Sequence, residues 1–228
     1  MTRTRFMSLR WWIALTVGIV VVVALTCVVV TTSSTSSSAA TMLDRLPVVT
    51  QSIEAPSYRR SEFGSGWADL DGDGCRTRDE VLLDTVDRSQ PYRVQRQGRC
   101  RADMVAGTWI DLYSGRSMTW SNLKDTAQAE SLPIDHIVSL AEAHRDGAKD
   151  WTRQRRVAFA NDELNLTPTT AALNSSKSDK GPADWTPPVA GRCAYATRYI
   201  VVKDRYRLPV DPKEKDALHL LLKSCRPI

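Results

Sequence analysis

Asp135 and His136 are adjacent in this chain, and Asn165, Asn174 and Lys177 follow within about forty residues. A carboxylate can hold a divalent cation, while a neighbouring neutral imidazole can accept a proton from water. Amide oxygens can complete the coordination of a cation that prefers oxygen ligands. The chain has only three histidines, and only His136 stands directly beside an acidic residue. These residue types predict a metal-dependent phosphodiesterase, and therefore a nuclease.

Three other residues have candidate chemistry, but their patterns are less specific. Glu142 and His144 lie on an expected helix shortly after the Asp-His pair, so either could stand near the site. His219 is expected to be a surface or packing residue.

The elements expected to position these residues alternate between short strands and helices. Residues 134–140 favour a strand that runs into a helix at 141–145. Residues 164–167 favour a short strand, and Pro168 can begin a helix that continues towards residue 179. Further helices are expected at 77–87, 151–162 (capped by Thr152), 194–207 and 212–223, with a strand at 101–111.

The letters IDHIV at 134–138, ELNL at 163–166 and NSSKSDK at 174–180 resemble the HNH endonuclease motif. The wider run 134–188 is similar to HNH domains related to the C-terminal region of GmrSD-type restriction endonucleases, and the similarity extends over roughly 58–225. The resemblance implies an α+β fold: a ββα-metal core, at 134–180, embedded in a mostly helical domain.

The resemblance also implies a role for each motif residue. Asp135 and Asn174 would bind the metal, and His136 would act as general base on the attacking water. Asn165 would brace the loop that carries the base, and Lys177 would contact a phosphate. Oxygen ligands favour Mg²⁺ or Mn²⁺ over zinc. DNA is the expected substrate.

A second metal motif lies upstream of the first. Asp69, Asp71, Asp73 and Glu80 occupy positions one, three, five and twelve of a calcium-loop pattern, with glycine at the sixth position. No convincing helix precedes the pattern, and Cys75 at the seventh position is a candidate for a disulfide. A structural calcium site and a tight turn before a helix therefore both remain open.

Length and charge set bounds on the functional class. A chain of 228 residues with 42% hydrophobic residues has room for one globular domain with a substantial core, placed at 58–228. Three of the 31 basic residues precede an apolar run near the N-terminus, which leaves 28 basic against 26 acidic residues. That balance does not identify a nucleic-acid-binding protein, so a basic surface requires local clusters such as Arg153, Arg155 and Arg156.

The N-terminal part of the chain predicts export. Residues 11–30 contain no charged residue, and three arginines lie within 1–10. This arrangement is typical of a single-pass membrane anchor with the domain outside the cytoplasm, and a cleaved signal peptide is the alternative. Residues 31–57 then form a Ser/Thr-rich linker.

The cysteines agree with an oxidising compartment. Cys27 lies within the apolar run, which leaves an even number, namely Cys75, Cys100, Cys193 and Cys225. Three connectivities are open, and the local pairs Cys75–Cys100 and Cys193–Cys225 are preferred because each encloses one contiguous segment. A zinc site is not favoured because no CxxC pair is present.

Together these features predict an exported, monomeric, metal-dependent HNH endonuclease that hydrolyses DNA. The alternative is a non-catalytic, calcium-stabilised binding module of the cell envelope, built on an HNH scaffold.

Overall fold

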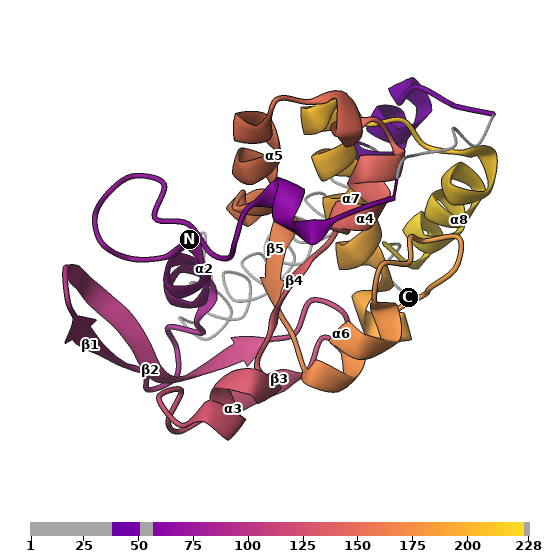
Figure 1. Ribbon diagram of the computed structural model, residues 1–228. Helices are drawn as coiled ribbons and strands as arrows, with labels where there is room; N and C mark the ends of the chain where they lie inside the picture. Colours follow the sequence, from indigo (N-terminus) through magenta and orange to yellow (C-terminus); the bar gives the residue numbers. More distant parts are fainter. Residues whose placement is uncertain (1–37, 51–56, 226–228) are drawn as a thin grey trace, which may run out of the picture.

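The computed structural model describes residues 38–50 and 57–225, and it has a mixed α+β architecture (Figure 1). Two short antiparallel strands, β4 (Ile134–His136) and β5 (Leu166–Pro168), run through the middle of the fold. A three-stranded sheet lies on one side of this pair, and a group of helices lies on the other. The residues expected to do chemistry therefore lie between two separately packed regions.

The three-stranded sheet is antiparallel and has the order β1 (Arg93–Gln97), β2 (Cys100–Ile110) and β3 (Ser117–Trp120). The helix α2 (Thr77–Thr85) packs against β2. Trp109 on β2 is fully buried, and its indole N–H donates a hydrogen bond to the backbone carbonyl of α2 at 2.8 Å. The sequence predicts a strand at 101–111, which is almost the observed range of β2. It predicts neither β1 nor β3, and β1 is polar and exposed throughout.

The helical region is built from α4 (Leu140–Arg145), α5 (Arg153–Ala160), α7 (Arg192–Tyr206) and α8 (Pro212–Leu222). Three of these helices begin after a capping side chain. The side chains of the preceding Ser139, Thr152 and Asp211 cap α4, α5 and α8, respectively. Along α7, residues three and four apart share the buried face, namely Tyr195, Ala196, Tyr199, Ile200, Val202 and Lys203.

Several short elements lie between these. The helix α3 (Thr126–Ser131) follows the three-stranded sheet. The 3-10 segments are η1 (Arg60–Phe63), η2 (Ala148–Asp150), η3 (Glu163–Asn165), η4 (Val189–Gly191) and η5 (Lys223–Cys225).

The central pair of strands leads directly into a helix. Asp135 pairs with Thr167 and His136 with Leu166 in the β4–β5 register. After β5, the side chain of Thr170 caps α6 (Ala171–Lys177). The long connection between the two strands contains α4 and α5, so Asp135 and Asn174 are neighbours only in the folded chain.

Two expected element boundaries are wrong. The strand expected to reach Leu140 ends at His136, because the Ser139 hydroxyl accepts a hydrogen bond from Glu142 N and starts α4 instead. Pro168 is the last residue of β5 rather than the first of a helix. The capping hydroxyl of Thr170, two residues later, places the start of α6.

Part of the expected linker at 31–57 is folded. Residues 38–45 are helical, and Leu43 is fully buried in the same core as α7 and α8. Val48 forms a parallel β-bridge with Val210. Folded structure therefore begins before Tyr58, because apolar side chains in this stretch reach the helical core.

The expected membrane segment at 11–30 lies outside the described residues. Within 38–50 and 57–225, no helix has both the length and the apolar character needed to cross a bilayer.

Two disulfides link the chain locally. Cys75 is bonded to Cys100, which joins the segment before α2 to the start of β2. Cys193 is bonded to Cys225, which joins the start of α7 to η5 after α8. Each bond therefore fastens neighbouring elements within one of the two regions.

Candidate active site

One cavity of about 290 Å³ is lined by three of the five expected motif residues. Asp135 and His136 on β4 line it together with Asn174 on α6. Tyr58 and Arg60, from the segment around η1, form part of the remaining wall. The structure thus assembles a carboxylate, an imidazole and an amide around one solvent-filled space.

His136 is held with a defined ring orientation. It is only 5% exposed, and its Nε2 lies 2.8 Å from the carbonyl oxygen of Ala160. A carbonyl can only accept, so Nε2 carries the proton and Nδ1 keeps a lone pair. The indole of Trp67 stacks on the imidazole, with ring centroids 5.7 Å apart and planes inclined by 14°.

Burial lowers the pKa of His136 to about 3. The hydrogen bond to Ala160 opposes this shift, and the positive charges of Arg60 and Lys177 add to it. The imidazole is therefore neutral near pH 7, which is the form that can accept a proton.

Asp135 has its two carboxylate oxygens in different environments. Its Oδ2 accepts a hydrogen bond from the Tyr113 hydroxyl at 2.6 Å and lies 3.0 Å from the Lys177 ammonium. Within the described part of the chain, Oδ1 has no hydrogen-bond partner. Asp135 therefore keeps one oxygen for a ligand while the other fixes the carboxylate.

Lys177 lies elsewhere than expected, because the structure buries it completely. Its ammonium donates to the backbone carbonyl of His136 at 2.8 Å in addition to pairing with Asp135. These contacts tie α6 to β4, and they leave the ammonium out of reach of a phosphate in solvent. The sequence shows a lysine one turn after Asn174 but not the direction of its side chain.

Asn165 joins the two sides of the long connection. It is fully buried, and its side-chain amide donates to Val138 O at 3.0 Å and accepts from Val138 N at 2.8 Å. Its backbone carbonyl accepts from Ile137 N at 2.8 Å. The two residues after His136 are therefore fastened to η3 by these three hydrogen bonds.

Four residues of the site carry no local signal in the sequence. Tyr113 orients Asp135, Trp67 covers His136, and Tyr58 lines the cavity. Arg60 is exposed and lines the hollows on both sides of His136. Each lies more than twenty residues before the Asp-His pair, so only the tertiary fold identifies them.

Glu142 and His144 do not line the cavity. Glu142 is buried in a charged cluster with Lys203 and Glu214, and burial raises its pKa to about 7 against the lowering effect of Lys203. His144 is buried with its Nε2 3.7 Å from a carboxylate oxygen of Glu62.

The basic cluster on α5 has mainly structural contacts. The Arg156 guanidinium donates to backbone carbonyls of η1, η2 and Trp151. Arg155 lies over the Trp151 ring at 4.2 Å. Arg153 and Arg155 are exposed, whereas Arg156 is partly buried by its backbone contacts.

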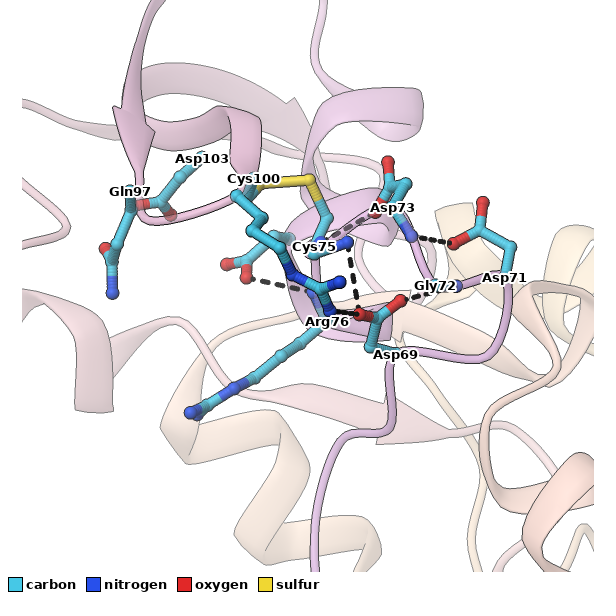
Figure 2. Close-up of a disulfide and its surroundings, with 12 residues drawn as sticks. Asp69, Asp71, Gly72, Asp73, Cys75, Arg76, Gln97, Cys100 and Asp103 are labelled. Atoms are coloured by element: carbon cyan, nitrogen blue, oxygen red, sulfur yellow. Dashed lines mark hydrogen bonds and ion pairs between the residues drawn. A yellow bond between two sulfur atoms is a disulfide. The ribbon is translucent and has the colours of Figure 1, made fainter.

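Figure 2 shows the acidic loop beside the Cys75–Cys100 disulfide. Ligand oxygens of Asp69, Asp71 and Asp73 lie within 4.8 Å of one another. Asp69 accepts hydrogen bonds from the backbone amides of Gly72 and Gly74, and Arg99 lies 3.4 Å from it.

Glu80, the expected twelfth-position ligand, is not part of this group of oxygens among the described residues. It lines an adjacent hollow together with Asp73. Burial, followed by the negative charges of Asp71, Glu163, Asp73 and Asp69, raises the pKa of Glu80 to about 7.

Comparison with known proteins supports the resemblance read from the motif. The family model for the C-terminal domain of GmrSD restriction endonucleases matches residues 76–220. An uncharacterized secreted protein of Arthroderma benhamiae is 37% identical over 171 residues, which cover 74% of this chain and 76% of that protein. No solved structure matches the chain. The chain therefore belongs to the family of the GmrSD restriction endonuclease C-terminal domain.

Proposed function

We propose that this protein is an exported, metal-dependent endonuclease that hydrolyses phosphodiester bonds in DNA. One observation carries the proposal: Asp135, His136 and Asn174 line a single cavity. The strand pair β4–β5 followed by α6 supplies them in the order that the ββα-metal arrangement requires. A binding module would have no need of a neutral imidazole with a free lone pair in that cavity.

The donor set fits a small divalent cation. Asp135 offers Oδ1, because Tyr113 and Lys177 occupy the other oxygen. Asn174 offers an amide oxygen from across the cavity. A site with two protein oxygens and room for water suits Mg²⁺ or Mn²⁺, which keep several water ligands. A bound cation would supply positive charge for the phosphate and for the departing 3′ oxygen.

His136 performs the proton transfer in this proposal. Its Nδ1 takes a proton from the water that attacks the phosphorus atom, while Nε2–H stays bonded to Ala160 O. Asn165 keeps the chain after His136 in place. The Lys177 ammonium binds both the His136 carbonyl and the Asp135 carboxylate, so it fixes the position of the base relative to the metal ligand.

Arg60 takes the phosphate-binding role that the motif suggested for Lys177. Its guanidinium is exposed at the cavity that holds Asp135 and His136. Arginine binds phosphate through paired, charge-assisted hydrogen bonds. A phosphate bound there would lie between Arg60 and the residues of β4.

Two findings support a site of action outside the cytoplasm. The two disulfides fit an oxidising compartment, and the relative from Arthroderma benhamiae is named as secreted. An anchor or a cleaved signal peptide at 11–30 stays a prediction from the sequence.

Nicking of supercoiled plasmid by the purified full-length chain tests the proposal. Cleavage is expected with Mg²⁺ or Mn²⁺, and EDTA should abolish it. His136→Ala should lose cleavage, whereas His219→Ala, which changes an exposed histidine outside the cavity, should retain it. Metal-independent cleavage, or equal cleavage by His136→Ala, would contradict the proposal. A parallel RNA substrate tests the preference for DNA.

A further inference from the structure

His136 is held by two segments that are far apart in the sequence. Ala160, at the end of α5, accepts the hydrogen bond from the edge of the imidazole at 2.8 Å. Trp67 covers the face of the same ring in a nearly parallel stack. Figure 1 shows η1, which leads into the Trp67 segment, lying across α5 and α4. The hydrogen bond to Ala160 thus restrains the imidazole within its plane, and the Trp67 stack restrains it perpendicular to that plane.

A single hydrogen bond connects these two supports. The backbone N–H of Ala68, next to Trp67, donates to Asn161 Oδ1 at 2.9 Å. Asn161 follows Ala160 directly, is buried, and donates its own amide N–H to Val157 O at 2.9 Å. Both ends of the Asn161 amide are therefore used. This hydrogen bond therefore couples the position of Ala160 to the position of Trp67.

The Trp67 segment is also seated on α5 and on α2. Phe63 is buried against Phe159, with ring centroids 6.3 Å apart. On the other side, Ala68 O accepts hydrogen bonds from Thr77 N at 2.8 Å and from Thr77 Oγ1 at 2.9 Å. Trp67 is therefore placed by two helices rather than by the motif that carries the base.

We propose that Trp67 is a positioning residue for His136, and that the Ala68–Asn161 hydrogen bond locks it to Ala160. The indole keeps the imidazole in the orientation that leaves the Nδ1 lone pair available to water in the cavity. This inference rests on the proposed nuclease function. Misplacing a reacting group by about 1 Å can cost on the order of a hundredfold in rate.

Imidazole ¹⁵N NMR tests the holding of the ring without reference to catalysis. The chain has three histidines, and the spectrum of His136→Ala assigns the signal of His136. The wild type should show a protonated Nε2 on His136 that exchanges slowly with solvent. Trp67→Leu should show faster exchange and mixed tautomers, while Trp67→Phe should resemble the wild type.

Trp120→Leu is a matched control. Trp120 is a partly buried tryptophan that packs against the same hydrophobic cluster as Trp67, but it stands on β3. Its substitution removes the same side chain without touching His136. The control should keep the wild-type His136 signal, and thermal unfolding should confirm that both leucine variants are folded.

Steady-state cleavage then links the ring to the reaction. Trp67→Leu should lower kcat by roughly ten- to a hundredfold with KM unchanged. Trp67→Phe should stay within about threefold of the wild type, because an aromatic face restores the stack. Wild-type kcat in a folded Trp67→Leu, or an unchanged His136 signal in that variant, would overturn the inference.

The two readouts also separate the inference from the function on which it rests. Absence of metal-dependent cleavage by the wild type would overturn the nuclease proposal. It would also overturn the claim that Trp67 contributes to catalysis. The NMR comparison would still decide whether Trp67 holds the ring.

Discussion

Asp135 and the three loop aspartates are the candidate metal-binding carboxylates among the described residues, and the fold holds them in opposite ways. Asp135 is buried, and a buried lysine and a buried tyrosine hydroxyl fix one of its oxygens. Asp69, Asp71 and Asp73 lie on a surface loop, and backbone amides of the loop supply most of their hydrogen bonds. The first group depends on distant parts of the fold, whereas the second is organised almost entirely by its own loop.

This difference shows what a sequence pattern can convey. The acidic loop has the clearer local pattern, because its spacing alone brings the three aspartates together. Asp135 has the weaker pattern, yet Tyr113 and Lys177 converge on its carboxylate from distant segments and fix its orientation. The proposed chemistry therefore depends on buried contacts between residues that are distant in the sequence. It does not depend on how many acidic residues lie close together.

Asp135→Asn should have the largest effect. Loss of the charge removes the proposed metal ligand and leaves the buried Lys177 without its anionic partner. Cleavage should fall by about a hundredfold or more, and the free energy of unfolding by about 3–5 kcal/mol. Asp71→Asn on the loop is the matched control, and should change stability by about 0.5 kcal/mol or less. Denaturant unfolding and plasmid nicking measure both quantities.

The double variant Asp135→Asn, Lys177→Met separates folding from catalysis. Removing both buried charges should recover much of the lost stability, since neither remains unpaired. Cleavage should stay lost. Stability losses that simply add would contradict the view that the two side chains form one buried pair.

The motif residues could be placed from the sequence because their order and spacing resemble the HNH motif. Asp135 and His136 stand together, Asn165 precedes β5, and Asn174 lies on the helix capped by Thr170. The general α+β class followed from the resemblance to HNH domains that these motifs carry.

The remaining parts of the site depend on tertiary contacts. Lys177 resembles a solvated surface lysine in the sequence, and only the fold shows that it points inward to the carbonyl of His136. Arg60, Trp67 and Tyr113 reach the site from segments that have no pattern of their own. The polar strand β1 is stabilised by its pairing with β2, so its composition does not predict a strand.

Removing the Cys75–Cys100 disulfide should affect the loop region and spare the active site. The bond closes a sequence separation of 25 residues, so Cys75→Ala with Cys100→Ala should lower the free energy of unfolding by about 3 kcal/mol. Cleavage should stay within about threefold, because the hydrogen bonds of Ala68 to Asn161 and Thr77 remain. Loss of cleavage in a folded variant would show that the loop supports the base after all.

Glu142 supplies a pH-dependent comparison from the helical core. Its pKa in the folded state is raised to about 7 by burial, and it faces Lys203, Glu214, Asp146 and Tyr199. Below its unfolded pKa of about 4.5, the carboxyl is protonated in both states and costs nothing. As pH rises to about 7, only the unfolded state releases the proton, so stability falls.

Glu142→Gln should remove this loss of folding stability between about pH 4.5 and pH 7. The variant and the wild type should be similarly stable near pH 4.5, and the variant should gain by about 3 kcal/mol relative to the wild type at pH 8. Denaturant unfolding across this pH range measures the difference. A pH-independent difference would mean that Glu142 is ionised in the folded state throughout.

Calcium should produce the smallest effect, and it bears directly on the acidic loop. If the loop pattern acts as a calcium site of the weak extracellular type, 1 mM Ca²⁺ should stabilise the fold by about 1 kcal/mol or less. Asp71→Asn should remove this gain without lowering cleavage, because Asp71 does not line the catalytic cavity. Glu80→Gln tests the separate position of Glu80: the gain should survive, since Glu80 is not grouped with the three loop aspartates. Loss of the calcium effect in Glu80→Gln would instead mean that the loop closes around the ion to include the twelfth position.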